Sequence, residues 1–317
     1  MKPLISFIIP CYNLPGHLLR ACINSIMALS LQEREREIIV VDDGSERSMT
    51  DVLSPYGKNI IYIRKENEGV SMARNTGMEQ SSGAYIQFVD GDDEMISSLY
   101  NQCIDIIRGG HADMVLFDHV SHRKPSISFK VSSPTEGVDF MMYNNLRAAV
   151  WGYIFRRDLA DDIKFSKGLA YGEDEEFTAR LILQAKALYR TTAQAYFYRK
   201  REASVINDMS RQAVEKRLAD GFCVVLRLQE LASNLSVRPR KALNRRVAQL
   251  SMDYIYNTIR LTKSPKAVDH CVRQLGEKGL FPLPSEDYTR KYRWFRLATK
   301  TRTGRNLLCL TSKIIDL

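Results

Sequence analysis

Short apolar runs of strand length alternate with helix-like segments over the first 120 residues, and this alternation constrains the fold more than any other feature. Apolar residues between the first two runs, at Leu19, Cys22, Ile23 and Ile26, have the spacing of an amphipathic helix. Strands that alternate with helices form βαβ units, in which the strands are parallel and helices cover both faces of the sheet. We therefore predict an α/β fold with a mostly parallel sheet. The expected strands are 4–9, 37–41, 60–63, 85–89 and 114–117.

Polar residues directly follow four of these runs. In open parallel sheets, ligands bind beyond the carboxyl ends of the strands, where the connecting loops meet. We therefore expect the four polar segments to lie along one edge of the sheet and to form the functional site. These segments are Pro10-Cys11-Tyr12-Asn13, Asp42-Asp43-Gly44-Ser45, Lys65-Glu66-Asn67-Glu68-Gly69 and Asp90-Gly91-Asp92-Asp93.

The last third of the chain is helical and strongly basic. Residues 1–204 contain 24 Lys and Arg against 27 Asp and Glu, a net charge of −3, whereas residues 205–317 contain 22 against 10, a net charge of +12. From about Val214 the apolar residues keep a helical period, and prolines divide this part into at least three helices. The asymmetry predicts two regions with different partners, divided at residue 204.

Several classes of protein are disfavoured by motifs that the sequence lacks. Phosphate-loop, dinucleotide-binding, zinc-protease and serine-hydrolase signatures are all missing. His119 and His122 have an H-x-x-H spacing but no third soft ligand nearby, so we do not predict a zinc site. Six scattered cysteines without a Cys-x-x-Cys pair favour reduced thiols in a reducing compartment. No signal peptide is expected, and no apolar stretch reaches the roughly 20 residues of a membrane span.

Three carboxylates crowd the turn at Asp90, Asp92 and Asp93. Carboxylates this close repel one another, so the cluster is costly unless a cation compensates. Mg²⁺ and Mn²⁺ prefer carboxylate oxygens and keep positions for water and substrate phosphate. The alternative is a solvated acidic turn at the end of a strand. Its place among the other polar segments favours a divalent metal site.

Asp43 and Tyr12 form a candidate pyrimidine pocket. The Asp43 carboxylate can accept a hydrogen bond from the imide N–H of uracil, and Tyr12 offers a flat face on which a base can stack. The alternative is that residues 42–45 only turn the chain and cap a helix. Arg74, one turn into the helix that follows Gly69, is a candidate ligand for a diphosphate. Its alternative is a surface ion pair.

Four acids open the helix that we expect over residues 173–188. Carboxylates at a helix start complement the helix dipole, but four exceed what that effect needs. One of them is therefore a candidate general base for a substrate hydroxyl. The aromatic and basic segment 196–201 is either a phosphate contact or a strand with a charged edge.

Together these residues resemble the family 2 glycosyltransferases of the GT-A fold, especially bacterial enzymes that build surface polysaccharides. The resemblance covers about residues 4–204. It implies a GT-A catalytic domain over 1–204, with a nucleotide-sugar half at about 1–95 and an acceptor half at about 96–204, followed by a basic helical region at 205–317. Besides the four polar segments, it rests on Ala73-Arg74-Asn75-Thr76-Gly77, Trp151-Gly152, Phe155-Arg156-Arg157, Gly172-Glu173-Asp174, and Tyr198-Arg199 with Arg201 and Ser204.

The resemblance also implies roles for individual residues. Asp174 would be the catalytic base, and Asp92 would bind the Mn²⁺ or Mg²⁺ that bridges the donor diphosphate. Asp90 would face the ribose or a metal-bound water, which makes it a second metal candidate. Trp151 would line the sugar or acceptor site. The nucleotide-sugar site would be formed by Pro10, Tyr12, Asn13, Asp43, Asn67, Gly69, Arg74, Asp90, Trp151 and Glu173.

The implied activity is inverting, metal-dependent transfer of a hexosyl or N-acetylhexosaminyl group from a UDP-sugar to a glycan or lipid-linked acceptor. Capsule, lipopolysaccharide or exopolysaccharide assembly would be the setting. Many relatives have Asn-Lys after the tryptophan, where this chain has Gly152-Tyr153; this departure concerns the acceptor contacts and not the donor site. The alternatives are a nucleotidyltransferase, which would normally carry a glycine-rich amino-terminal loop with Lys or Arg, and a non-catalytic nucleotide-sugar or polysaccharide-binding protein. The presence of Asp43, Asp90, Asp92 and Asp174 argues against the second.

Residues 286–305 interleave seven basic residues with four aromatic ones. One interpretation is a segment that rests on an anionic membrane at the inner, cytoplasmic face, where lipid-linked acceptors lie. The other is a solvated helical face whose Arg and Lys side chains extend into water. We do not predict nucleic-acid binding, because the positive residues lie outside the polar edge of the sheet and no nucleic-acid module is visible.

Overall fold

The computed structural model describes residues 2–122, 128–200, 208–286 and 288–314. The chain forms two compact units, Met1–Glu202 and Ala203–Leu317. The division that the sequence predicts at residue 204 lies outside the described residues, as do Arg201 and Ser204 of the basic segment.

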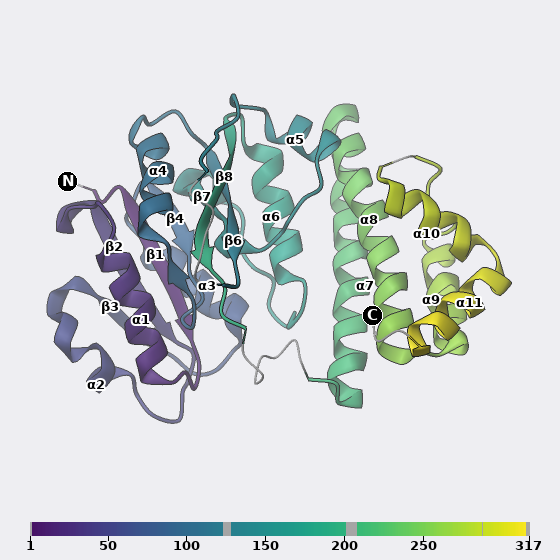
Figure 1. The fold of residues 1–317 in the computed structure, drawn as a ribbon, viewed down its shortest axis with the longest axis horizontal. Helices are drawn as coiled ribbons and strands as arrows, with labels where there is room; N and C mark the ends of the chain where they lie inside the picture. Colours follow the sequence, from purple (N-terminus) through teal and green to yellow (C-terminus); the bar gives the residue numbers. More distant parts are fainter. Residues whose placement is uncertain (1, 123–127, 201–207, 287, 315–317) are drawn as a thin grey trace. The chain divides into compact units, whose positions relative to one another are not determined.

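The first unit is built on one eight-stranded sheet with helices on both faces (Figure 1). Its strand order is β3-β2-β1-β4-β7-β6-β8-β5. The strands are β1 Ile5–Cys11, β2 Arg36–Asp42, β3 Ile61–Arg64, β4 Tyr85–Phe88, β5 Glu94–Met95, β6 Met114–Val120, β7 Tyr153–Arg156 and β8 Leu188–Phe197. Its helices are α1 Gly16–Met27, α2 Thr50–Leu53, α3 Val70–Gln80, α4 Ser97–Arg108, α5 Gly137–Tyr143 and α6 Glu173–Gln184, with short 3₁₀ segments at Glu33–Glu35, Ser54–Asn59, Val150–Gly152 and Arg157–Ala160.

The α/β prediction is confirmed, but the sheet is more mixed than the sequence predicts. Four of the seven neighbouring pairs of described strands are parallel, and the pairs β4–β7, β6–β7 and β5–β8 are antiparallel. The strand β7 lies between β4 and β6 in the middle of the sheet and runs antiparallel to both, so it accounts for two of the three antiparallel pairs.

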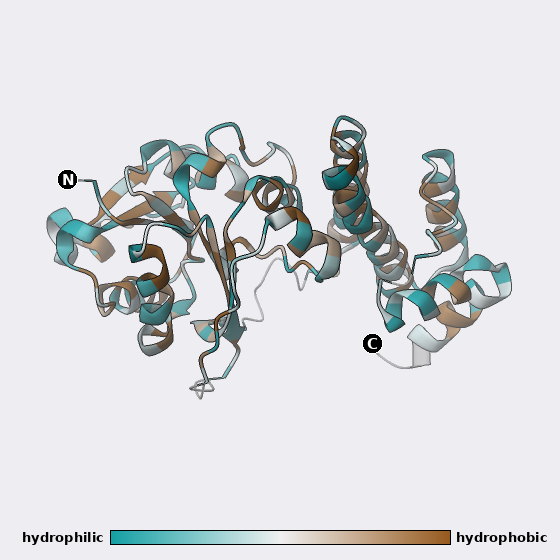
Figure 2. Ribbon diagram, turned by 90° about the horizontal axis from the view of Figure 1, so that it is seen from above, coloured by the Kyte–Doolittle hydropathy of each residue, from teal (hydrophilic) through white to brown (hydrophobic). Residues whose placement is uncertain are grey.

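Alternating side chains bury both faces of the central strands. On β1, Phe7 and Ile9 join the core under α1 and α4, whereas Ile8 lies against Gly77 of α3. Further along the sheet, the rings of Phe88 and Phe177 pack edge to face, which seats α6 on the same face as α3. Figure 2 shows the strands as hydrophobic and many of the helices as two-sided, as a three-layer arrangement requires.

The helix that opens with four acids is shorter than predicted. We expected it over 173–188, but α6 ends at Gln184 and Leu188 already begins β8. The carboxylate of Asp113 accepts hydrogen bonds from the backbone N–H groups of Lys186 and Ala187, at 2.6 and 3.0 Å. These contacts turn the chain out of the helix and into the sheet.

The second unit is a group of helices around its own apolar core, in agreement with the predicted helical region. Pro265 occupies the first turn of α9, where a missing N–H costs nothing. Pro239 lies inside the first turn of α8 and so does not separate two helices. The helices are α7 Arg211–Ser233, α8 Val237–Thr262, α9 Pro265–Glu277, α10 Arg290–Lys300 and α11 Arg302–Ile314. Among the described residues, no helix combines the length and apolar character needed to cross a bilayer.

Candidate active site

Strand directions bring the predicted site residues to one edge of the first unit. The strands β1, β2 and β4 are parallel, and β6 has the same direction because two antiparallel pairings, through β7, separate it from β4. The segments after these strands therefore leave from the same edge. Since β7 runs the opposite way, its beginning, next to Trp151, lies at that edge as well.

The first two loops at this edge are tied together by hydrogen bonds. The backbone N–H of Asn13 donates to Ser45 Oγ at 2.9 Å, and Asn13 Oδ1 accepts from the N–H of Glu46 at 2.9 Å. Asn13 has a φ of 46°, in the left-handed region that asparagine tolerates better than most residues. The loop turns so that the Tyr12 side chain is 55% exposed, with its ring open to a ligand.

Asp43 is buried and holds the third loop in place. Its Oδ2 accepts the N–H of Gly69 at 2.7 Å, and its Oδ1 accepts from the N–H of Glu68 and from Lys65 Nζ, both at 3.1 Å. Next to it, Gly44 has a φ of 78°, and a Cβ there would lie 2.7 Å from the backbone nitrogen of Asn67. The two loops pack so closely that only glycine fits.

Arg74 of α3 is buried and contacts three partly exposed carboxylates. One terminal nitrogen lies 3.0 Å from Glu173 Oε1 and 2.7 Å from Asp174 Oδ1, and the other lies 3.4 Å from Asp90 Oδ1. The guanidinium lies over the ring of Phe165 at 5.4 Å from its centroid. The Arg74 side chain is 5% exposed, so it is not the surface ion pair that the sequence left as an alternative.

Two carboxyls that contact Arg74 have raised pKa values. Burial, with Glu173 as a negative neighbour, raises the pKa of Asp174 to about 7, although Arg74 opposes the shift. Burial, with Asp174 and Asp92 as negative neighbours, raises the pKa of Asp90 to about 6, again against Arg74. Strongly shifted carboxyls that meet at the edge of a sheet are typical of catalytic sites. The Oδ2 of Asp174 also accepts the N–H of Val150 at 3.3 Å, which fixes the carboxylate beside the chain that leads to Trp151.

Arg199, which follows β8, binds the acidic turn through its backbone and its side chain. Its backbone N–H donates to Asp93 Oδ1 at 2.7 Å, its Nε donates to the carbonyl of Asp92 at 2.9 Å, and its guanidinium pairs with Glu94. Asp93 is buried, and burial together with Asp90 raises its pKa to about 8. The basic segment after β8 therefore meets the acidic turn, a contact that the sequence did not indicate.

Trp151 belongs to a stack of aromatic side chains. Its ring lies parallel to that of Tyr196, with centroids 4.7 Å apart, and is stacked at 5.8 Å on Tyr198. The ring of His119 packs edge-on against Trp151 at 4.9 Å. Because Tyr196 Oη accepts the N–H of Asp90 at 3.0 Å, the stack adjoins the acidic turn as well as Val150.

The structure thus joins some of the predicted residues directly and others through their neighbours. Arg74, Asp90, Glu173 and Asp174 are in contact, and Trp151 is linked to them by Val150. Asp43 reaches the cluster through Gly69, the residue from which α3 begins. Sequence reasoning missed Val150 and Phe165. Val150 contributes only its backbone N–H and Phe165 only a ring against the Arg74 guanidinium, and neither contact requires a recognisable motif.

The donor set at the acidic turn fits a divalent metal that also uses substrate oxygens. In the described part of the chain, no group of three or more His, Cys, Asp or Glu side chains is arranged to hold a metal ion. Mg²⁺ and Mn²⁺ are commonly bound by one or two carboxylates with substrate phosphates completing the coordination. Asp90 and Asp92 offer the hard oxygen donors for such a site, because both follow β4 at the edge of the sheet.

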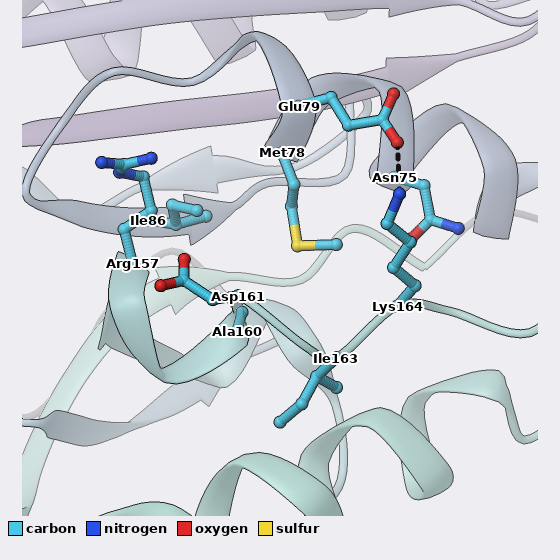
Figure 3. Close-up of a pocket in the computed structure, with 9 residues that line it drawn as sticks. All are labelled: Asn75, Met78, Glu79, Ile86, Arg157, Ala160, Asp161, Ile163 and Lys164. Atoms are coloured by element: carbon cyan, nitrogen blue, oxygen red, sulfur yellow. Dashed lines mark hydrogen bonds and ion pairs between the residues drawn. The ribbon is translucent and has the colours of Figure 1, made fainter.

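A small cavity beside α3 is lined by other residues than those of this cluster. It measures about 130 Å³ and is bounded by α3, β4 and the 3₁₀ segment after β7 (Figure 3). Asn75 and Arg157 line it, and the ion pair between Lys164 Nζ and Glu79 spans 2.6 Å at its side. None of the predicted site residues borders it.

Comparison with known proteins decides which family this site belongs to. The family model described as glycosyl transferase family 2 matches residues 6–163. The chain belongs to glycosyltransferase family 2. The match includes every predicted donor-site and metal residue except Glu173; the candidate base Asp174 also lies beyond its end.

Curated relatives in the family carry the same kind of name. The chain is 27% identical over 234 residues to the uncharacterized glycosyltransferase EpsJ of Bacillus subtilis, a match that covers 69% of this chain and 67% of the relative. It is 26% identical over 224 residues to glycosyltransferase GlyA of Streptococcus pneumoniae, covering 63% of this chain but 31% of the relative. The matches therefore span between about a third and two thirds of these two relatives.

Solved structures share the fold. TarS 1–349 of S. aureus in complex with UDP-GlcNAc has a TM-score of 0.65 at 18% identity, covering 99% of this chain and 92% of that one. Mannosyltransferase PcManGT from Pyrobaculum calidifontis, in complex with GDP-Man and Mn²⁺, has a TM-score of 0.57 at 12% identity, covering 100% and 88%. At these identities the likeness establishes a common GT-A-type fold.

Proposed function

We propose that this family 2 glycosyltransferase moves a hexosyl or N-acetylhexosaminyl group from a UDP-sugar to an acceptor hydroxyl, with inversion, in surface-polysaccharide assembly. The observation that carries the proposal is the contact of Asp174 with Arg74, which also reaches Asp90 on the acidic turn. This contact places a carboxyl with a strongly raised pKa next to the turn suited to a metal and a diphosphate.

The donor nucleotide binds at the first three loops. Tyr12 provides the exposed ring for uracil, with Pro10 and Asn13 shaping the pocket around it. Asp43 accepts the imide N–H of uracil with a lone pair beyond those used by Lys65 and the loop amides, since a carboxylate has about four such positions. Asn67 and Gly69 lie beside the nucleotide. The crystallisation of TarS with UDP-GlcNAc and with UDP supports uridine as the nucleoside.

Asp92 and Asp90 would hold Mn²⁺ or Mg²⁺ when donor is bound. The ion would supply positive charge against the leaving diphosphate, which is electrostatic stabilisation of charge that develops in the transition state. PcManGT was crystallised with Mn²⁺, and that supports a metal for a protein of this fold. Arg199 keeps the turn in one conformation through the Asp92 carbonyl and the Asp93 carboxyl.

Asp174 acts as the base. Its carboxylate takes the proton of the acceptor hydroxyl while the hydroxyl oxygen bonds to the anomeric carbon, and the bonding pair of the broken C–O bond leaves with the nucleoside diphosphate. A single displacement inverts the anomeric configuration. The Val150 N–H orients the Asp174 carboxylate, and Arg74 keeps it from being fully protonated at neutral pH. Glu173 also pairs with Arg74, and its negative charge raises the pKa of Asp174.

The aromatic stack forms the wall of the acceptor side. Trp151 lies one residue beyond Val150, so a sugar ring stacked against this wall would present a hydroxyl near Asp174. Tyr198 and His119 extend the wall outward from Trp151, and both are partly exposed. This arrangement suits a glycan acceptor. All six cysteines are free thiols, as is typical of proteins in a reducing compartment such as the cytoplasm. A lipid-linked glycan at the inner face of the cytoplasmic membrane would be accessible from that compartment.

Release of UDP from a panel of UDP-sugars with Mn²⁺, with and without oligosaccharide acceptors, tests this function. We expect one donor to be turned over, and Asp174→Asn to lower the rate by about 10²–10⁴-fold while UDP affinity stays within about threefold. Asp105→Asn, which changes an exposed carboxylate paired with Arg108, is the matched control and should leave the rate unchanged. Equal rates for wild type and Asp174→Asn would remove Asp174 from the role of base.

A further inference from the structure

Large apolar side chains are exposed in unusual density on α10 and α11 of the second unit (yellow in Figure 1). Trp294 and Leu297 of α10 are 69% and 50% exposed, and Leu307 and Leu310 of α11 are 59% and 55% exposed. Isolated exposed apolar residues are normal, but clusters of them mark interaction surfaces. We call these four residues the apolar stripe.

The stripe lies on the faces of the two helices that point away from the core. On α10 the buried residues are Tyr292 and Thr299, and Trp294 and Leu297 lie about half a turn away from them. On α11 Cys309 is buried, and Leu307 lies about 160° away from it around the helix. Each helix therefore has an apolar side facing the core and a second apolar side facing outward.

The two helices that carry the stripe have basic residues and no acidic ones. Residues 290–314 contain eight Lys and Arg and no Asp or Glu. Arg290, Arg293 and Lys300 of α10 are exposed beside the stripe. Two further basic residues of these helices contact the rest of the second unit: Arg305 pairs with Asp269 of α9 at 2.9 Å, and Lys291 lies over the ring of Tyr256.

We propose that the outer face of α10 and α11 docks on an anionic lipid bilayer. Trp294, Leu297, Leu307 and Leu310 enter the boundary between headgroups and acyl chains, and Arg290, Arg293 and Lys300 contact the acidic headgroups. A helix with apolar residues on the outside and basic residues beside them is the arrangement of interfacial helices, and Trp favours the bilayer interface.

The positive charge of this surface favours an anionic membrane over a second copy of the chain as its partner. A second copy of the chain would bring the same positive residues against this face, and like charges repel. An anionic membrane meets both properties at once, since it neutralises the basic residues and buries the apolar ones. The reason for docking, access to a lipid-linked acceptor, rests on the proposed function; the binding itself does not.

Co-sedimentation of the full chain with vesicles tests the proposal. We expect binding to phosphatidylglycerol–phosphatidylcholine vesicles and at least tenfold weaker binding to pure phosphatidylcholine. The chain has two tryptophans, and Trp151 is buried whereas Trp294 is exposed. Vesicles with acidic lipid should therefore shift the tryptophan emission to shorter wavelength and protect it from acrylamide, and Trp294→Phe should abolish most of that change.

Matched pairs of variants distinguish binding through this face from non-specific hydrophobic or electrostatic binding elsewhere on the chain. The double variant Trp294→Ser with Leu297→Ser should lower binding at least tenfold, whereas Tyr143→Ser, a change at a 75% exposed aromatic residue of the first unit, should not. The triple variant Arg290→Ser, Arg293→Ser and Lys300→Ser should lower it about tenfold or more. Its control removes three exposed cations elsewhere in the second unit: Arg211, Lys241 and Lys266.

Three results would overturn the proposal. They are no preference for acidic vesicles, loss of binding in the control triple equal to that in the test triple, and a dimer in solution that only the Trp294 and Leu297 double variant dissociates. UDP release from the donor is measured on the same samples. A chain that binds acidic vesicles but turns over no nucleotide-sugar would refute the proposed function and leave the docking surface standing.

Discussion

At the scale of single residues, Arg74 sets the protonation of the carboxyl group proposed as the base. Asp174 is surrounded by Glu173 and Asp90, and without a cation its buried carboxyl would stay neutral well above pH 7. Arg74 holds its pKa at about 7 instead. A base with a pKa near the working pH is both available as the anion and able to take a proton.

The activity should therefore depend on pH through Asp174. Because the carboxylate is the active form, kcat/KM should fall about tenfold per pH unit below pH 7 and level off above it. Arg74→Met removes the cation that lowers this pKa, so the acidic limb should move to higher pH. Arg108→Met, at a partly exposed arginine paired with Glu35, is the control. A limb that stays in place in Arg74→Met would show that another group titrates.

The buried Asp93 carboxyl should make the free energy of unfolding fall as the pH rises. Its pKa is about 8 in the folded chain and near 4 in an unfolded one, so the folded state binds the extra proton between these values and stability falls as pH rises from 4 to 8. Asp93→Asn keeps an oxygen for the N–H of Arg199 and should stabilise the chain by about 1–3 kcal/mol at pH 8. The gain should shrink toward pH 5. Thermal unfolding at both pH values, in chelator, measures it, and a gain that is the same at pH 5 and pH 8 would contradict this account.

At the scale of elements, the site depends on how closely α3 approaches β1. Gly77 lets the helix lie against Ile8, since a Cβ at that position would be 2.2 Å from Ile8 Cγ2. The same helix carries Arg74, less than one turn earlier, into the carboxylate cluster. Close packing of one helix on one strand therefore sets the depth at which the arginine lies.

Two glycine-to-alanine changes should act in opposite directions. Gly77→Ala overpacks the contact with Ile8 and should destabilise the first unit by about 1–3 kcal/mol. Gly221→Ala in α7 meets nothing within 4 Å and should stabilise the second unit by about 0.5–1 kcal/mol, because alanine is the better helix former. Differential scanning calorimetry of both variants tests the pair. A shift of the same sign in the two would contradict the packing argument.

At the scale of the whole molecule, the two units differ in charge as well as in fold. The sequence up to 204 carries a net charge of −3 and the rest +12. Opposite signs suit separate tasks, since carboxylates serve a metal and a base whereas arginines and lysines serve an anionic surface. The proposed chemistry and the proposed docking should thus respond differently to salt.

Raising NaCl from 0.05 to 0.5 M should weaken binding to acidic vesicles by about tenfold or more, because screening shortens the reach of exposed charges. UDP release without vesicles should change by less than about twofold, since Arg74 is buried and salt screens its contacts with the partly exposed carboxylates less than it screens fully exposed charges. Sedimentation and UDP release on the same preparation measure both. Vesicle binding that is indifferent to salt would leave only the apolar stripe to explain docking.

The sequence by itself determined the strands of the first unit and the edge at which the polar residues lie. Apolar runs must be buried and loops must leave from strand ends, so the pattern alone is enough to place Tyr12, Asp43 and Asp90 along one edge. It also determined the charge of the second unit and the helical character of that region.

Only the tertiary structure decided which of these residues touch. That Arg74 joins Asp174 across 100 positions, that Arg199 holds Asp93, and that α6 stops at Gln184 all depend on contacts between distant segments. Local sequence fixes the period and burial of an element, but the partner of a buried charge is set by packing, because any carboxylate that the fold brings within hydrogen-bonding distance can satisfy it.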